Sequence, residues 1–174
     1  MEAWDIYDKD RIKTNKVVKR GRPLDQGEFH LVVHVCIFNS SDQLLIQQRQ
    51  AFKDGWPNKW DLTVGGSAHA GESSRMAAER ELFEEIGHKV DLSAIRPSFT
   101  INFNGGFDDF YIISEEVNLK DLTLQDSEVK TVCWASKDQI VRMIESGTFI
   151  PYHKSLIEMI FDMKNQYGAH ANLP

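Results

Sequence analysis

The segment that decides the fold covers residues 65–88 and reads GGSAHAGESSRMAAERELFEEIGH. Residues 73–86 contain no glycine, proline or run of β-branched residues, and they are rich in Ala, Glu, Arg and Leu. These residues favour a helix, and Gly87 is suited to end it in a left-handed conformation. The segment therefore predicts a helix that follows the glycine pair Gly65-Gly66.

Three glutamates share one edge of this predicted helix. At about 100° per residue, Glu81, Glu84 and Glu85 fall within a sector about 100° wide. Like charges four residues apart destabilise a helix, so Glu81 and Glu85 favour a nearby cation or the protonation of one carboxyl group. Mg²⁺ binds carboxylate and carbonyl oxygens, which makes this edge a candidate metal site. Taken alone, such a cluster is more typical of a solvated acidic surface.

The other positions of the helix indicate how it is placed. Arg80 lies beside the glutamate edge and is predicted to pair with a carboxylate and so fix its orientation. A different side of the helix carries large apolar residues, and we expect this side to pack against the core. These residues are Met76, Leu82, Phe83 and Ile86.

Strand-like stretches flank this helix on both sides in the sequence. Residues 4–19 predict an exposed hairpin, and residues 30–38 and 43–49 predict a second hairpin in the core. Further strands are expected at residues 60–64, 98–103, 110–114 and 129–134, and C-terminal helices at residues 136–146 and 153–166. Because strands and helices do not alternate strictly, the pattern indicates an α/β fold with a mixed sheet between helices.

Composition narrows the class of protein. The chain has 174 residues, 41% hydrophobic and 26% charged, which is typical of one globular domain over residues 1–174. The net charge of -6 and the lack of a long basic run argue against a nucleic acid polymer as partner. Without a signal-like start or a membrane-length apolar run, we expect a cytoplasmic protein with no membrane partner. Cys36 and Cys133 are expected to be reduced thiols.

The spacing within the opening segment is more specific than its charge. Gly66, Glu72 and the run Arg80-Glu81-Leu82-Phe83-Glu84-Glu85-Ile86-Gly87 resemble the Nudix box, with every invariant residue in place. The one departure is His88, which stands where an aliphatic residue is usual. The resemblance implies a single Nudix domain with an α/β/α sandwich fold and a box over residues 66–88.

The resemblance also implies which residues bind metal. Glu81, Glu84 and Glu85 would be the carboxylate ligands, and a carbonyl oxygen of Gly65 or Gly66 would lie nearby. The implied metal is Mg²⁺, with Mn²⁺ as a substitute. In such a site the metal polarises a diphosphate and activates water.

A carboxylate from the helix or from a loop serves as the general base in this family. Glu84 and Glu72 are the candidates within the box, and Arg80 orients the catalytic carboxylates. Asp108 and Asp109 are a further option, since they are expected between strands near the site. An acidic hairpin turn explains those two aspartates equally well.

Outside the box, residues 4–145 are similar to the isopentenyl-diphosphate isomerase branch of the Nudix superfamily. This similarity is carried by Phe29-His30-Leu31, Ile37-Phe38-Asn39 and Trp56-Pro57-Asn58-Lys59-Trp60. Those isomerases need a cysteine and a histidine, which fall here on Gly65 and Ser67. Isomerisation therefore ranks second, because no replacement for the protonating cysteine is nearby.

Three cations fall where those isomerases hold the diphosphate. They are Lys19, Arg49 and Lys53. Arginine and lysine side chains are the chemistry that a diphosphate needs, so we expect these residues to bind substrate. Ordinary surface charges explain Arg49 and Lys53 equally well.

The leading hypothesis is Mg²⁺-dependent hydrolysis of a diphosphate linkage in a nucleoside diphosphate derivative or a similar small organic diphosphate. The alternatives are an isomerase-like activity and a Nudix domain that binds a nucleotide without cutting it, which the intact glutamate set disfavours. The apolar C-terminal helix leaves a homodimer open, although packing on the sheet is the simpler expectation.

Overall fold

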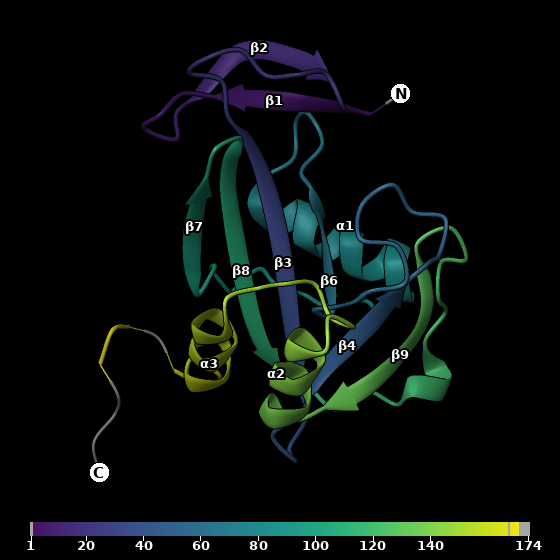
Figure 1. Cartoon of the computed structure of the whole chain (residues 1–174). Coiled ribbons are helices and arrows are strands. Elements are labelled where there is room, and N and C mark those ends of the chain that lie inside the picture. The colour runs from purple at the N-terminus through teal and green to yellow at the C-terminus, as the bar shows by residue number, and fades with distance from the viewer. Residues whose placement is uncertain (1, 167, 171–174) are drawn as a thin grey trace.

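The computed structural model describes residues 2–166 and 168–170 of the chain. A seven-stranded mixed sheet lies between α1 on one face and α2 with α3 on the other (Figure 1). The strands are β1 (Ala3–Tyr7), β2 (Lys13–Lys19), β3 (His30–Phe38), β4 (Leu44–Arg49), β5 (Trp60–Asp61), β6 (Val64–Ser67), β7 (Phe99–Phe103), β8 (Gly106–Ser114) and β9 (Val129–Ala135). The helices are α1 (Ser74–Ile86), α2 (Lys137–Glu145), α3 (Lys154–Asp162) and the short 3₁₀ helix η1 (Leu119–Asp121).

The sheet has the order β5-β4-β3-β8-β7, while β6 pairs with β3 and β9 pairs with β4. Only β3 and β8 run parallel, and the other strand pairs of this sheet are antiparallel. The expected α/β fold with a mixed sheet between helices is therefore confirmed. No helix among the described residues has the length and apolar character needed to cross a membrane.

Strand β3 builds both halves of the core because successive side chains point to opposite faces of a sheet. Four of its residues join the core cluster on the α1 side: Leu31, Val33, Val35 and Ile37. Cys36 and Phe38 join the cluster that α2 and α3 cover. A strand buried on both faces explains why its sequence is almost continuously apolar.

Two strand predictions need correction. The stretch expected as one strand over residues 60–64 is two strands, β5 and β6, because Thr63 turns inward between them. Its hydroxyl donates to the Leu45 carbonyl at 2.5 Å and accepts from the Ile37 N–H at 3.0 Å. Strand β8 begins at Gly106 rather than at residue 110, so Asp108 and Asp109 lie inside it. The prediction that they lie between strands is wrong.

Helix α1 has the bounds that its sequence predicts. The Ser73 hydroxyl accepts a hydrogen bond from the Met76 N–H at 3.2 Å, which caps the first turn. Gly87 ends the helix with a left-handed φ of 69°, and its N–H donates to the Leu82 and Phe83 carbonyls. The Ser73 side chain therefore determines where the helix begins, and the left-handed backbone of Gly87 determines where it ends.

The buried side of α1 differs from the prediction. Leu82 and Ile86 are fully buried as expected, but Met76 is 47% exposed and Phe83 is 51% exposed. The buried residues are Ala77, Ala78, Glu81, Leu82, Glu85 and Ile86. The helix is rotated so that its glutamate edge lies against the sheet, and this rotation places Met76 and Phe83 beyond the core.

The C-terminal helices agree with the sequence in position but not in length. Ser136 and Gln139 form the predicted capping box of α2. Helix α3 ends at Asp162, so the prediction that it reaches residue 166 is wrong. Asn165 takes a positive φ of 66°, which interrupts the helix, and its side-chain oxygen accepts from Ser114 Oγ at 2.7 Å.

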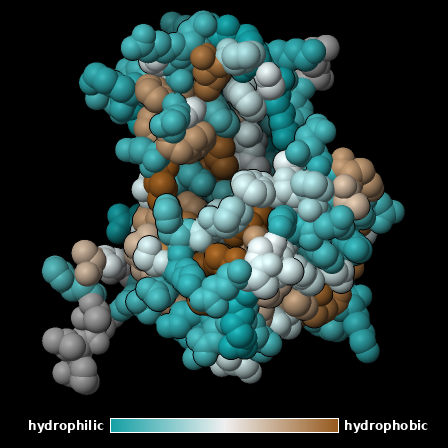
Figure 2. Space-filling view, viewed as in Figure 1, coloured by the Kyte–Doolittle hydropathy of each residue, from teal (hydrophilic) through white to brown (hydrophobic). Residues whose placement is uncertain are grey.

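The N-terminal hairpin β1–β2 forms its own two-stranded sheet above one end of the main sheet (Figure 1). Apolar side chains gather where the hairpin meets the main body (Figure 2). The expectation of exposed strands holds for most of β2, but Ile6 and Val18 are buried. Trp4 stacks on His30 with 4.2 Å between ring centroids, which ties the hairpin to β3.

A buried carboxylate joins the hairpin to the sheet and to α1. Asp109 is fully buried, forms an ion pair with Arg11 of the hairpin, and accepts hydrogen bonds from the Thr100 and Ser74 hydroxyl groups at 2.6 Å each.

Asp109→Ala should lower the free energy of unfolding by about 1–3 kcal/mol, because it leaves these donors without an acceptor. Urea denaturation measures the loss. Asp10→Ala is the control, since the exposed Asp10 side chain pairs with adjacent Lys9 and with no other side chain among the described residues. A loss equal to that of Asp109→Ala would contradict the assignment.

Candidate active site

One cleft of about 130 Å³ gathers most of the predicted site residues. Its acidic residues are Glu2, Glu81, Glu84, Glu85 and Glu128, and its basic residues are Arg20, Arg49, Lys53 and Arg80. Gly65, Gly66, His69 and Gln125 complete the lining. The structure therefore brings the helix glutamates, the glycine pair and several cations together around one small space.

Gly66 lets the helix approach β6 closely, whereas Gly65 faces His34 on the opposite side of the sheet. A side-chain carbon added to Gly66 would overlap the Glu81 carboxylate. One added to Gly65 would lie 2.6 Å from His34 Cδ2. A side chain at either position would therefore displace its neighbour, and Glu81 is packed directly against the strand.

Arg80 organises the carboxylates, as the sequence predicts. Its Nε donates to Glu72 Oε1 at 2.7 Å, and its Nη2 donates to Glu72 Oε2 and to the Ser67 carbonyl at 3.0 Å. Its Nη1 donates to Glu81 Oε1 and Glu84 Oε2 at 2.9 Å each. One guanidinium thus holds three carboxylates, and the prediction that Arg80 pairs with a carboxylate is confirmed.

Glu72 lies outside the lining of the cleft. Besides its two bonds from Arg80, it accepts the His69 N–H at 2.7 Å. Burial raises the pKa of Glu72, but the hydrogen bonds from Arg80 and from His69 outweigh burial and leave the pKa below its usual value. Glu72 is therefore occupied in holding Arg80 and the turn before the helix.

Glu85 is the most strongly perturbed carboxyl group of the cleft. It is 4% exposed, and its Oε2 accepts from Gln47 Nε2 at 2.7 Å. Burial, and then the charge of Glu81, raise the pKa of Glu85 to about 8. Burial also raises the pKa of Glu81, although Arg80 opposes the shift. The cleft therefore favours a proton or a cation beside these two groups.

The oxygen-only donor set of this edge fits a hard divalent cation. Within the described residues, no three His, Cys, Asp or Glu side chains are arranged as a metal site. Arg80 donates to Glu81 and Glu84, and Gln47 donates to Glu85. The side-chain oxygen of Gln47 is buried without a hydrogen-bond partner among these residues. The fit therefore rests on ligand chemistry and on two adjacent buried carboxyl groups, Glu81 and Glu85, whose pKa values burial raises.

The predicted diphosphate-binding cations lie in different places. Arg49 and Lys53 line the cleft, where Arg49 Nε donates to the Gly55 carbonyl at 3.0 Å and Lys53 pairs with Glu128. Lys19 is exposed in β2 and does not line the cleft. The next residue, Arg20, does line it and pairs with Glu2. The sequence pointed to this segment but not to Arg20 itself.

The loop carboxylate in the cleft is Glu128, not Asp108 or Asp109. Asp109 belongs to the buried network of the hairpin, and Asp108 Oδ1 lies 2.7 Å from His34 Nδ1. Glu128 reaches the cleft because the loop before β9 is held to α1, where the Gln125 N–H donates to the Glu85 carbonyl at 2.9 Å. No sequence motif marks Glu128, since its place depends on this long-range contact.

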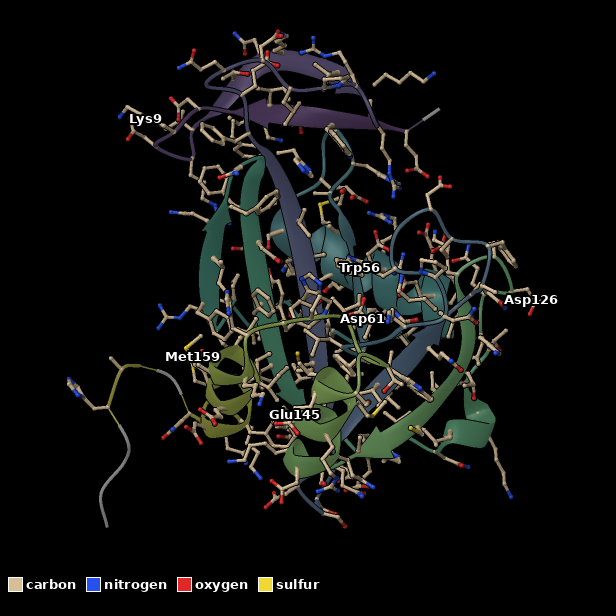
Figure 3. The ribbon with its side chains drawn as sticks, in the orientation of Figure 1. Lys9, Trp56, Asp61, Asp126, Glu145 and Met159 are labelled. Carbon is tan, nitrogen blue, oxygen red and sulfur yellow. The ribbon has the colours of Figure 1, made fainter. Side chains whose placement is uncertain are left out.

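A buried polar network lies behind the glycine pair. Tyr152 Oη donates to Asp61 Oδ1 at 2.8 Å and lies 3.2 Å from His34 Nε2. Asp61 is buried and lies near the connection that leads to α3 (Figure 3). Its Oδ2 is 3.8 Å from Arg49 Nη1. The network therefore links a cation of the cleft to the core.

Comparison with known proteins identifies the family. Residues 28–158 match the family profile described as NUDIX domain. The chain belongs to the Nudix family. It is 49% identical to an uncharacterized Nudix hydrolase of Listeria innocua, over 98% of this chain and 99% of that protein. The predicted family and its hydrolase class are thereby confirmed.

Two further likenesses describe this Nudix hydrolase. It is 35% identical to an isopentenyl-diphosphate Delta-isomerase of Pectobacterium atrosepticum, over 52% of this chain and 49% of that protein. Similarity to isomerases is therefore confirmed over about half of the chain, a shorter span than the expected residues 4–145. A crystal structure from Deinococcus radiodurans superposes with a TM-score of 0.72 at 22% identity, covering 91% of this chain and 97% of the other. At this low sequence identity, the similarity shows a shared fold and nothing about activity.

The contact between Gly66 and Glu81 yields a mutational prediction. Gly66→Ala should abolish most hydrolase activity while changing the free energy of unfolding little, because the added methyl group displaces only the flexible end of Glu81. Gly106→Ala is the matched control, since its methyl group would overlap the His30 backbone carbonyl and must destabilise the sheet. Urea denaturation and activity assays separate the two variants, and full activity of Gly66→Ala would contradict the assignment.

The raised pKa of Glu85 predicts how stability depends on pH without divalent metal. The folded state retains the Glu85 proton up to about pH 8, whereas the unfolded state releases it near the usual carboxyl value. Stability from this group is therefore complete below about pH 4.5 and is lost as pH rises toward 8. In EDTA, the free energy of unfolding of the wild type minus that of Glu85→Gln should decrease as the pH rises from about 5 to about 8. A difference that does not change with pH would refute this.

Proposed function

We propose that this Nudix hydrolase cleaves a diphosphate linkage in a nucleoside diphosphate derivative or a similar small organic diphosphate, and that it uses Mg²⁺. The supporting observation is that one cleft holds both a carboxylate edge and a set of cations. Carboxylates bind the metal and cations bind phosphate oxygens, so the two sets together suit a metal-bound diphosphate.

The residues that would hold Mg²⁺ are Glu81, Glu84 and Glu85, with a carbonyl oxygen of Gly65 or Gly66. The metal, when bound, polarises the phosphorus–oxygen bonds and lowers the pKa of water. Mn²⁺ has the same oxygen preference and would serve as a substitute. Binding requires Glu81 and Glu84 to exchange part of their contact with Arg80 for the cation.

Arg49 and Lys53 would bind the phosphate oxygens, and Arg20 would assist them from the hairpin. Gly55 and Glu128 hold Arg49 and Lys53 respectively at the rim of the cleft. The planar guanidinium of Arg49 can donate two parallel hydrogen bonds to one phosphate. We keep Lys19 as a weaker candidate, because it neighbours Arg20 without lining the cleft.

Glu84 is our candidate for the general base. Its side chain is 46% exposed, so it can contact water, and it shares a single Arg80 nitrogen with Glu81. The attacking water would transfer a proton to Glu84 while its oxygen bonds to phosphorus and the bridging phosphorus–oxygen bond breaks. Glu72 is the weaker candidate because Arg80 occupies both of its oxygens, and Glu128 is neutralised by Lys53.

An isomerase is the second candidate, and two positions weigh against it. Gly65 carries no thiol and Ser67 carries no imidazole. A side chain at Gly65 would also collide with the His34 ring at 2.6 Å, so His34 occupies the space that a cysteine would need. The complete glutamate set likewise disfavours a domain that only senses a nucleotide.

The proposal predicts Mg²⁺-dependent release of phosphate or of a monophosphate from a panel of small diphosphates. Glu85→Gln should lower turnover by orders of magnitude without unfolding the protein, because its carboxylate serves the metal rather than the core. Steady-state phosphate release with and without EDTA measures both effects.

Glu79→Gln is the matched control on the same helix. Its carboxylate accepts the Leu92 N–H at 2.9 Å and does not line the cleft, so near wild-type turnover is expected. If no member of the panel is cleaved, or if Glu85→Gln is fully active, the proposed function is wrong.

A further inference from the structure

Arg49 lies between the cleft and a buried carboxylate. It lines the cleft, and its Nη1 lies 3.8 Å from Oδ2 of Asp61, which does not line the cleft. The Arg49 side chain is 17% exposed and the Asp61 side chain is 9% exposed, so water and salt screen this ion pair only weakly. A carboxylate with so little access to water needs a cation nearby. Asp61 and Arg49 are therefore held to each other by charge.

The core fixes the other oxygen of Asp61. Oδ1 accepts the Tyr152 hydroxyl at 2.8 Å and the Leu62 N–H at 2.8 Å. Burial and then the charge of Asp61 raise the pKa of Tyr152, so its hydroxyl keeps its proton and remains a donor. Oδ1 is thus occupied by two donors, while Oδ2 is directed to Arg49.

The segment that carries Tyr152 is itself bonded to β5. The Trp60 N–H donates to the Thr148 carbonyl and the Ile150 N–H donates to the Trp60 carbonyl, both at 2.9 Å. Asp61 directly follows Trp60, so these bonds bring Asp61 and Tyr152 together, and Figure 3 shows Asp61 near this connection. The position of the Asp61 carboxylate is therefore set by two segments far apart in the sequence.

The loop after β4 holds Arg49 at a second point. Its Nε donates to the Gly55 carbonyl at 3.0 Å, and its backbone N–H donates to the Lys59 carbonyl at 2.9 Å. Gly55 on Nε and Asp61 near Nη1 together fix the plane of the guanidinium. Neither contact uses Nη2, and Nη1 has two N–H groups, so Arg49 can still donate two parallel hydrogen bonds to a phosphate.

This arrangement distinguishes Arg49 from the other cations that face the proposed phosphate position. The carboxylate partners of Lys53 and Arg20 are 29% and 48% exposed, so water screens those pairs more strongly. A long side chain that must be immobilised by its ligand weakens binding, and a side chain held beforehand avoids this cost. Arg49 is held beforehand, and Asp61 supplies one of its two fixed points.

We propose that Asp61 is a positioning residue that holds the Arg49 guanidinium ready for a phosphate group in the cleft. This rests on the proposed function, in which Arg49 binds phosphate oxygens, and adds a residue that acts through Arg49 without touching the substrate. Asp61 affects the affinity for the diphosphate and takes no part in the chemical step. Its negative charge alone would repel a phosphate, so positioning and simple repulsion predict effects of opposite sign.

The test is a double-mutant cycle between Asp61 and Arg49. The probe is methylenediphosphonate, a diphosphate analogue without a bridging oxygen to cleave, titrated calorimetrically in the presence of Mg²⁺. Asp61→Asn keeps an acceptor for Tyr152 but removes the charge, and it should raise the Kd about twofold to tenfold, the usual cost of immobilising one long side chain. In the Arg49→Gln background the same substitution should leave the Kd unchanged. For a diphosphate that the wild type cleaves, KM should rise by the same factor with kcat little changed.

Asp54→Asn is the matched control. Asp54 is exposed in the loop after β4 and does not line the cleft, so this variant removes the same charge nearby and should leave the Kd unchanged. The inference is wrong if Asp61→Asn lowers the Kd or leaves it unchanged, or if Asp54→Asn has the same effect. An equal effect of Asp61→Asn with and without Arg49 would show a merely structural role and would also overturn it.

Urea denaturation shows whether Asp61→Asn is folded. If it is not, Tyr152→Phe takes its place in the cycle, because it removes the hydroxyl that orients Asp61 without changing a charge. The same rise in Kd is then expected, again only with Arg49 present, and its absence overturns the inference. If the wild type neither binds methylenediphosphonate nor cleaves any diphosphate, the proposed function itself has failed.

Discussion

The close packing of α1 on Gly66 of β6 is the constraint on which the site depends. No side chain separates Gly66 from Glu81, so the helix rests on the strand by its glutamate edge rather than by a purely apolar side. Burial in this position raises the pKa values of Glu81 and Glu85. The fold therefore holds two carboxyl groups together in a buried position, where a proton or a cation relieves their repulsion.

Arg80 is the second organising element, because one guanidinium distributes its donors among three carboxylates and a carbonyl. It connects the turn before α1, through Glu72 and Ser67, with the helix glutamates. Glu72 thereby becomes part of the support, and Glu84 remains the box carboxylate most accessible to water. Glu72 and Glu84 are both glutamates of the box, but their different hydrogen bonds give them different surroundings.

Apart from Arg80, the cations of the cleft come from segments outside the box. Arg20 follows β2 of the hairpin, Arg49 ends β4, and Lys53 lies in the loop after β4. Gln125 and Glu128 belong to the loop before β9. Such loops differ among proteins that share a catalytic frame, so the organic part of the substrate depends on them. The loop before β9 reaches the cleft because it pairs with the last turn of α1.

The sequence alone determined the local features: the ends of α1 at Ser73 and Gly87, the capping box of α2, the mixed sheet between helices, and the glutamate set with Arg80 beside it. The helix ends and the glutamate set follow from spacing and capping within a few residues, and the mixed sheet follows from the order of strands and helices along the chain. Only the tertiary structure decided which side of α1 is buried, that Asp109 is structural, and that Arg20 and Glu128 line the cleft. These outcomes depend on contacts between segments far apart in the chain, where packing space and burial, rather than local propensity, determine each side chain's position.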